Sequence, residues 1–147
     1  KINNAAGQKR IVDFYLQNMR YVNNWDLVDA SCYKILGEYC SQYKLEDILN
    51  NLTYSVSLWE RRISIVSCFA YVKKYELNFL YSIVPRFFND KHDLIHKACG
   101  WMLREAGKIN KPLLEKFLQE NSKAMPKIML RYALEKFSAK EKSSILK

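Results

Sequence analysis

Glycine and proline are scarce in this sequence of 147 residues, which contains four glycines and three prolines. An all-β sandwich or barrel needs many tight turns, and these two residues supply most of them. Long stretches without either residue therefore favour helices over strands. The sequence also lacks an apolar run long enough to cross a bilayer, and no signal peptide is recognisable. We expect a helical protein that does not enter a membrane.

Paired cysteine motifs are also missing, although the chain has four cysteines. Cys32, Cys40, Cys68 and Cys99 lie in apolar helical stretches, and none belongs to a C-x-x-C pair. Such residues are typical of small buried side chains in a reducing compartment, so we expect a cytoplasmic protein. We take this compartment to be the bacterial cytoplasm or nucleoid.

Several catalytic motifs are absent as well. There is no glycine-rich phosphate loop and no G-x-S-x-G elbow, so nucleotide hydrolysis and acyl transfer have no support. His92 and His96 are four residues apart, the spacing of a possible metal-ligand pair, but no third histidine exists. We predict that these two residues cap and pack their helix and that the protein binds no metal.

Acidic residues are outnumbered: 24 lysines and arginines face 15 aspartates and glutamates, which gives a net charge of +9. This excess favours a polyanionic partner, nucleic acid first and an anionic membrane surface second. General solubility is the alternative interpretation. Aromatic residues make up 14% of the chain, and aromatic rings among cations can stack on bases or sugars.

Hydrophobic periodicity predicts about nine helices joined by short polar links. Gly37 and Gly107 are possible helix ends, and Pro85 must kink or shorten its helix. The expected ranges are 8–20, 25–40, 45–54, 58–73, 76–88, 93–106, 111–120, 126–137 and a last helix from about 139. Pairs of about 35–42 residues match HEAT or armadillo repeats. The sequence thus predicts one all-α domain over residues 1–147, a right-handed α-solenoid of antiparallel helix pairs, with a compact helical bundle as the alternative.

Three tryptophans mark acid/base clusters at intervals near one helix pair. Trp59 and Trp101 are followed by residues of both charge signs, and Trp25 is followed by two aspartates. We predict that the three tryptophans start corresponding helices and face a common groove. Trp25 and Asp29 are four residues apart, so they share one face of a helix that Asn24 can cap. An indole beside a carboxylate favours positive charge, such as that of an oxocarbenium-like sugar. The alternative is that Asp29 serves the helix dipole while Trp25 packs.

Basic residues form two further candidate sites. Arg61 and Arg62 point about 100° apart on one helix, so one can bind a phosphate while the other pairs with a carboxylate of a neighbouring repeat. An ion pair within the helix is the alternative. The second half of the chain is rich in cations that can hold a phosphate backbone or simply form a solvated face: Lys97, Arg104, Lys108, Lys111, Lys127, Arg131 and Lys136.

Four blocks of the sequence resemble the AlkD-type DNA glycosylases of alkylation repair. They are residues 23–29, which contain Trp25 and Asp29, and residues 58–66, 92–108 and 125–137. The blocks occur in the order of the family and are spread over most of the chain, from residue 23 to residue 137. The resemblance implies a HEAT-like solenoid that cradles duplex DNA and excises purines alkylated at N3 or N7. It also implies catalysis without a metal or cofactor and without a deep base pocket.

The resemblance also implies roles for individual side chains. Asp29 matches the catalytic carboxylate, Trp25 and Trp101 match the indoles that flank the sugar of the lesion, and Arg62 matches the arginine that holds its phosphate. Arg61 is the less suitable match for that arginine. The expected DNA-binding side chains are those of Arg61, Lys97, Arg104, Lys108, Lys127 and Arg131.

Members of this family carry further helical repeats before the Trp-Asp block, whereas about twenty residues precede it here. We therefore expect additional repeats upstream in the native protein, and a monomer whose groove is filled by duplex DNA. Two other functions stay open. One is a non-catalytic protein that binds damaged or branched DNA, and the other is a scaffold for an acidic protein.

Overall fold

Helices form every regular element of residues 4–147, the part of the chain that the computed structural model describes. No strand occurs in that part, so the protein is all-α, as the scarcity of turn residues predicts. The elements are α1 (Ala5–Asn18), η1 (Met19–Tyr21), α2 (Trp25–Cys32), η2 (Tyr33–Gly37), α3 (Glu38–Tyr43), α4 (Glu46–Leu52), α5 (Leu58–Ser67), α6 (Phe69–Lys73), α7 (Asn78–Ile83), η3 (Val84–Phe87), α8 (Asp93–Ile109), α9 (Lys111–Asn121), α10 (Lys127–Ala133) and α11 (Ala139–Ile145).

The eleven α-helices form nine continuous helical stretches within residues 4–147. Helix α2 passes through the π-helical segment η2 into α3, and α5 continues into α6 through Cys68, whose backbone lies in the right-handed helical region. Gly37 and Gly107 do not end their helices, contrary to expectation. The chain stays helical to Tyr43 in the first case and to Ile109 in the second, and each glycine packs closely against a neighbouring element.

Local sequence signals explain several helix ends. The side chain of Asn24 accepts a hydrogen bond from the Leu27 amide at 3.0 Å, which confirms it as the N-cap of α2. Pro85 lies where α7 changes into the 3₁₀ segment η3. The hydroxyl of Ser57 accepts a hydrogen bond from the Glu60 amide at the start of α5, and the Glu60 carboxylate accepts one from the Ser55 hydroxyl.

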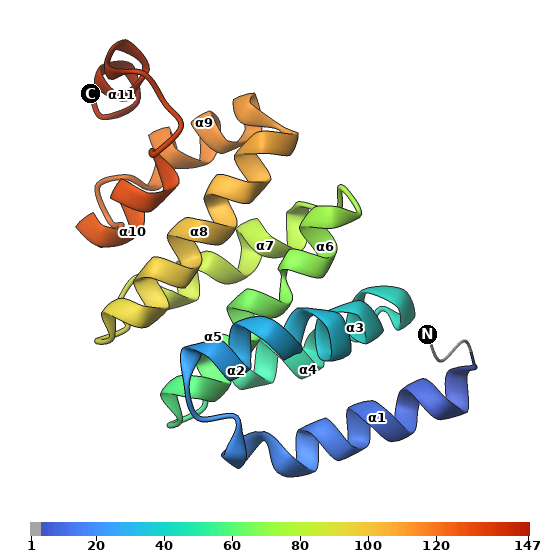
Figure 1. Ribbon diagram of the computed structural model, residues 1–147. Coiled ribbons are helices and arrows are strands. Elements are labelled where there is room, and N and C mark those ends of the chain that lie inside the picture. Colours follow the sequence, from blue (N-terminus) through green and yellow to red (C-terminus); the bar gives the residue numbers. More distant parts are fainter. Residues whose placement is uncertain (1–3) are drawn as a thin grey trace.

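Successive helices lie side by side from α1 at one end of the molecule to α11 at the other (Figure 1). Helix α2 packs on α5, α5 on α8, and α8 on α10, which makes one row. Helices α4, α7 and α9 pack against members of this row. The row brings side chains of α2, α5 and α8 next to one another, although they are far apart in the sequence.

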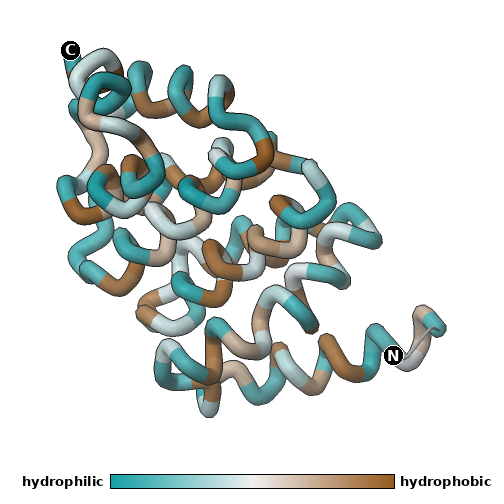
Figure 2. The backbone as a smooth tube through the Cα atoms, turned by 45° about the horizontal axis from the view of Figure 1, so that its top comes forward, coloured by the Kyte–Doolittle hydropathy of each residue, from teal (hydrophilic) through white to brown (hydrophobic). Residues whose placement is uncertain are grey.

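One hydrophobic core runs through these layers. Apolar and polar positions alternate along each helix with the helical period, as the colouring of Figure 2 shows, and the apolar side chains meet between the helices. All four cysteines are buried and unpaired, as predicted. Burial raises the pKa of the Cys32 thiol to about 12, so this thiol stays protonated near neutral pH. No helix within residues 4–147 combines the length and apolarity needed to span a membrane.

Candidate functional site

A hollow of about 310 Å³ lies where α2, α5, α8 and α10 meet. It contains all four side chains for which the sequence suggests a catalytic role. The residues that line it are Trp25, Asp29, Arg62, Leu94, Lys97, Trp101, Arg104 and Tyr132. Residues from four separate helices thus form one surface of indoles, a carboxylate and cations.

Helix α2 contributes Trp25 and Asp29, one turn apart. The capping bond from Asn24 fixes the start of this helix directly before Trp25. The Trp25 residue is 53% exposed, so much of its indole faces solvent rather than the core. A large apolar ring left open in this way is available to a ligand.

Asp29 and Arg62 form a two-pronged ion pair across the α2–α5 contact. Arg62 donates from Nε to Oδ1 at 3.0 Å and from Nη2 to Oδ2 at 2.8 Å. The Arg62 side chain is 7% exposed and that of Asp29 is 19% exposed. Arg62 also donates from Nη1 to the carbonyl oxygen of Leu94, which ties the pair to the first turn of α8. The carboxylate is therefore oriented, partly neutralised and still open to the hollow.

The guanidinium of Arg62 retains capacity for a further anion. It has five N–H bonds, of which three are used on Asp29 and Leu94. An anion at the remaining N–H groups of Arg62 would share its charge with Asp29. The hollow is thus lined by a negative charge on Asp29 and a positive charge on Arg62, which lie at hydrogen-bond distance from each other.

Helix α8 supplies the other wall of the hollow. Lys97, Trp101 and Arg104 recur every three or four residues along it, so they share one face. Trp101 lies midway along α8 and not near its start, so the expectation that each tryptophan begins its helix is wrong for this residue. Arg104 binds the carboxylate of Glu135, which lowers the pKa of Glu135.

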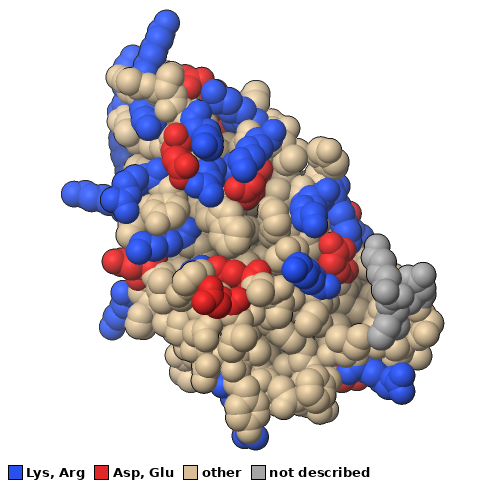
Figure 3. Space-filling model, viewed as in Figure 1, with Lys and Arg blue, Asp and Glu red and all other residues tan. Residues whose placement is uncertain are grey.

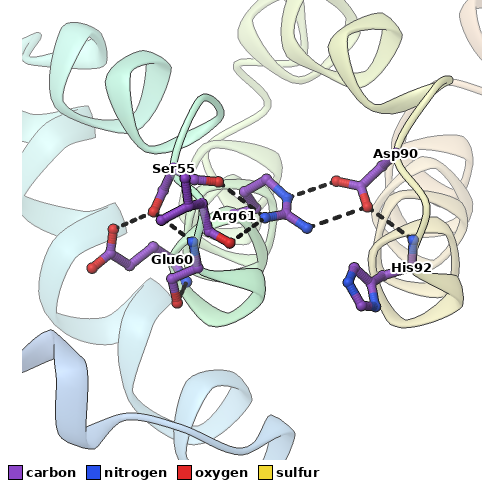
Figure 4. Close-up of polar contacts among 7 residues, drawn as sticks. Ser55, Glu60, Arg61, Asp90 and His92 are labelled. Atoms are coloured by element: carbon purple, nitrogen blue, oxygen red, sulfur yellow. Dashed lines mark hydrogen bonds and ion pairs between the residues drawn. The ribbon is translucent and has the colours of Figure 1, made fainter.

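Arg61 does not line this hollow. It is held by four hydrogen bonds, and Figure 4 shows it between Ser55 and Asp90. Its Nε and Nη2 donate to Asp90 at 2.7 and 3.4 Å, and its Nη1 donates to the carbonyl oxygens of Ser55 and Val56. Burial opposes ionisation of Asp90, but the hydrogen bonds from Arg61 and from the His92 amide outweigh it, so the pKa of Asp90 is lowered. Arg61 therefore joins two loops, whereas Arg62 belongs to the hollow.

The other predicted DNA-binding side chains lie at or beyond the rim. Lys97 and Arg104 line the hollow, whereas Lys108, Lys127 and Arg131 do not. Lys108 pairs with Glu105 at 2.7 Å, and Arg131 lies over the ring of Tyr132. Basic side chains gather over the upper part of this face, near α8 to α11 (Figure 3).

Some expectations about single residues need correction. Trp59 packs against the core and does not line the hollow, so the three tryptophans do not share one groove. Leu94 and Tyr132 do line it, but sequence reasoning gave neither of them a role. Position alone could have indicated Leu94, which precedes Lys97 by one helical turn.

The two histidines have different surroundings. His92 is exposed and occupies the N-cap position of α8, while His96 is buried and lies 3.8 Å from the Asp93 carboxylate through Nδ1. Within residues 4–147, no three His, Cys, Asp or Glu side chains gather in a way that could hold a metal ion.

Comparison with known proteins shows the family of the chain. The family model of the DNA alkylation repair enzymes matches residues 2–137, which is all of the chain except its first residue and its last ten. Among curated proteins, none matches the sequence at a significant level. The match spans all four helices that line the hollow. The chain therefore belongs to the family of DNA alkylation repair enzymes.

Proposed function

We propose that the protein is a monofunctional DNA glycosylase that hydrolyses the N-glycosidic bond of N3- and N7-alkylated purines in duplex DNA. The observation that carries this proposal is the convergence of Trp25, Asp29, Arg62 and Trp101 on one solvent-accessible hollow. These side chains come from three helices, so their meeting is a property of the tertiary structure. Family membership supports the same reaction class.

The chemistry of an alkylated purine suits this hollow. Such a base carries a positive charge, and the electron pair of the C1′–N bond leaves with it, so the departing base becomes neutral. Positive charge then develops on the deoxyribose, where the carboxylate of Asp29 and the ring faces of Trp25 and Trp101 stabilise it. A water oxygen bonds to C1′, and Asp29 accepts the proton that this water loses.

Arg62 has two roles in the proposal. It orients the Asp29 carboxylate, and its remaining N–H groups bind the phosphate next to the damaged nucleotide. The negative charge of the phosphate partly neutralises the guanidinium, so the guanidinium neutralises Asp29 less. Asp29 therefore has more net negative charge in the DNA complex than in the free protein, where it is paired with Arg62 alone. This charge stabilises the cationic sugar.

The overall architecture proposed with this function is a right-handed solenoid of HEAT-like helix pairs that acts as a monomer on duplex DNA. The progression of neighbouring helices along one direction supports it. In this arrangement Lys97, Arg104, Lys108, Lys127 and Arg131 hold the DNA backbone beside the hollow. No metal or cofactor is assigned a step.

Two alternatives differ from this proposal in defined ways. A non-catalytic protein that binds damaged or branched DNA needs the cations but has no use for a carboxylate between two indoles. A scaffold for an acidic protein needs neither the carboxylate nor the open Trp25 ring. The composition of the hollow therefore favours the enzyme.

The decisive experiment measures base release from duplex DNA that contains 7-methylguanine. We expect Asp29→Asn to lower the single-turnover rate of base release by at least about 100-fold, because the charge that stabilises the sugar is lost. Duplex affinity is expected to stay nearly unchanged, since the asparagine oxygen still accepts a hydrogen bond from Arg62.

Asp26→Asn is the matched control, because Asp26 is an exposed carboxylate in the first turn of the same helix. This variant is expected to release the base at the rate of the parent protein. Equal rates for the parent protein and Asp29→Asn, with both folded by circular dichroism, would exclude the proposed role of Asp29.

A further inference from the structure

A row of three aromatic rings leads away from the hollow across three elements. The ring of Trp101 in α8 lies 6.1 Å from that of Phe69 in α6, measured between centroids. The ring of Phe69 lies 5.2 Å from that of Tyr33 in η2, in an edge-to-face arrangement. All three residues are half-buried, so each ring retains an accessible part.

This row connects two hollows of the surface. Trp101 lines the candidate site, and Tyr33 lines a cavity of about 540 Å³ between α1 and the stretch from η2 to α3. Lys34, Lys73 and Glu38 line the same cavity, and the carboxylate of Glu38 pairs with Lys74. The three aromatic rings thus lie between the candidate site at one end and the cavity with Lys34 and Lys73 at the other.

Both lysines are held over these rings. The Nζ atom of Lys73 lies 5.5 Å from the Tyr33 centroid and 5.8 Å from that of Phe69. The Nζ atom of Lys34 lies 5.5 Å from the Tyr33 centroid. The electron-rich ring faces therefore keep two ammonium groups close to one aromatic side chain.

The charges of these lysines are not neutralised by carboxylates. Among the residues that the structure describes, no ion pair involves Lys34 or Lys73, whereas the adjacent Lys74 pairs with Glu38 at 3.0 Å. Ring faces attract an ammonium group without cancelling its charge. Both ammonium groups are exposed, so an anion can reach them.

The dimensions of the row suit a nucleic acid strand. One strand advances about 3.4 Å per nucleotide along the duplex axis. Two ring steps of 5.2 and 6.1 Å therefore correspond to a few nucleotides from the damaged position. Figure 3 shows a separate group of basic side chains on the right of this face, over α6, apart from the larger group over α8 to α11.

We propose that Tyr33, Phe69, Lys34 and Lys73 form an aromatic–lysine clamp that binds backbone phosphates of a DNA strand a few nucleotides from the lesion. The clamp extends the DNA track from the hollow toward α3 and α6, on the side away from α10. The two lysines bind the phosphates, and the rings position the lysines and contact the sugars between them. The identity of the ligand as DNA rests on the proposed function.

The test measures binding to undamaged duplex DNA by fluorescence anisotropy between 50 and 200 mM KCl. Each phosphate contact changes the slope of log K against log salt by about 0.9. Lys34→Met and Lys73→Met are each expected to make the slope shallower by about this amount. Lys140→Met removes the same charge from an exposed position on α11, outside the row, and should leave the slope unchanged.

The rings are tested by variants that keep every charge. Phe69→Leu and Tyr33→Leu are expected to weaken duplex binding by about threefold, because the lysines lose the ring faces that hold them. The salt slope should stay that of the parent protein. Tyr33→Phe keeps the ring and should restore the parent affinity, which separates the proposed role from a role of the hydroxyl.

Base release from 7-methylguanine DNA is measured on the same proteins to keep the two proposals apart. Altered slopes for the lysine variants without base release by the parent protein would retain the clamp and reject the glycosylase. Base release with parental slopes for Lys34→Met and Lys73→Met would reject the clamp alone. Loss of binding to polyglutamate without a change in the DNA slope would assign the lysines to an acidic protein and also overturn the clamp. If the parent protein shows no salt-dependent duplex binding, neither proposal survives.

Discussion

Adjacent arginines on one helix have different tasks because their side chains leave the helix about 100° apart. Arg62 reaches Asp29 on α2, and Arg61 reaches Asp90 in the loop before α8. Both pairs are largely withdrawn from water, and each joins segments about thirty residues apart. Only the first pair borders the hollow. A substitution in the Arg61–Asp90 pair can therefore measure how much such an ion pair adds to the free energy of unfolding, without changing the hollow.

The lowered pKa of Asp90 predicts how this contact responds to acid. A carboxylate with a folded-state pKa below its unfolded value of about 3.9 stabilises the fold above that pH, and the contribution is lost as the pH falls through the folded-state pKa. We expect Asp90→Asn to lower the free energy of unfolding by about 2 kcal/mol at pH 7. The difference from the parent protein should shrink below about pH 4. Urea unfolding from pH 7 to pH 3 measures both effects.

Glu135→Gln is the control for Asp90→Asn. The pKa of Glu135 is also lowered by an arginine, Arg104, but the side chain of Glu135 is 47% exposed. Solvent screens this pair, so its replacement should change stability much less than Asp90→Asn. A constant difference between Asp90→Asn and the parent protein over the whole pH range would contradict the assignment of the acid response to Asp90.

Helices in this protein approach one another closely at glycines. A Cβ atom on Gly100 would lie 2.5 Å from both the carbonyl oxygen of Met129 and the Cβ atom of Tyr132. Helix α8 can thus pack against α10 at short distance, and this contact brings Tyr132 to the hollow beside Trp101. At Gly107 the nearest atom is the end of the flexible Leu114 side chain instead.

This difference predicts opposite outcomes for two similar substitutions. Gly100→Ala is expected to destabilise the fold by about 1–3 kcal/mol or more, because backbone atoms must move, and to slow base release by shifting Tyr132. Gly107→Ala should be nearly neutral, since Leu114 can change rotamer and alanine is favoured over glycine within a helix by about 1 kcal/mol. Thermal unfolding of both variants tests this. Equal destabilisation would show that the α8–α10 distance does not depend on Gly100.

The charge distribution of the whole molecule supports binding to a polyanion rather than to one anionic group. The net charge is +9, and the face seen in Figure 3 presents basic side chains both over α8 to α11 and over α6. A ligand that contacts both groups must be extended and negatively charged along its length. Duplex DNA, the proposed substrate, meets this description, and the proposal places its damaged nucleotide between the two groups.

Contacts of this kind make duplex affinity strongly dependent on salt. For about eight phosphate contacts, one for each cation that the two proposals place on the DNA backbone, we expect the affinity for undamaged duplex DNA to fall about 10⁴-fold between 50 and 200 mM KCl. Anisotropy titrations over that range measure the slope, with an acidic polypeptide of similar length as the control ligand. A weak salt dependence for DNA together with tighter binding of the polypeptide would favour the scaffold function.

Much of the helical framework could be predicted from the sequence because its signals are local. Asn24 and Pro85 act within one turn, and buried cysteines follow from the helical period of their neighbours. The candidate site could be predicted less fully. Leu94 and Tyr132 carry no motif of their own, and Trp59 resembles the other two tryptophans in sequence although it packs against the core.

The sequence by itself determined the helical class, most helix limits and the family, since these depend on short-range spacing and on blocks of adjacent residues. Only the tertiary structure decided which arginine meets Asp29, because both arginines have an aspartate about thirty residues away. It also decided that Trp25 and Trp101 share a hollow from which Trp59 is absent. Contacts between distant helices depend on the angle and distance at which the helices pack, and local sequence does not encode either quantity.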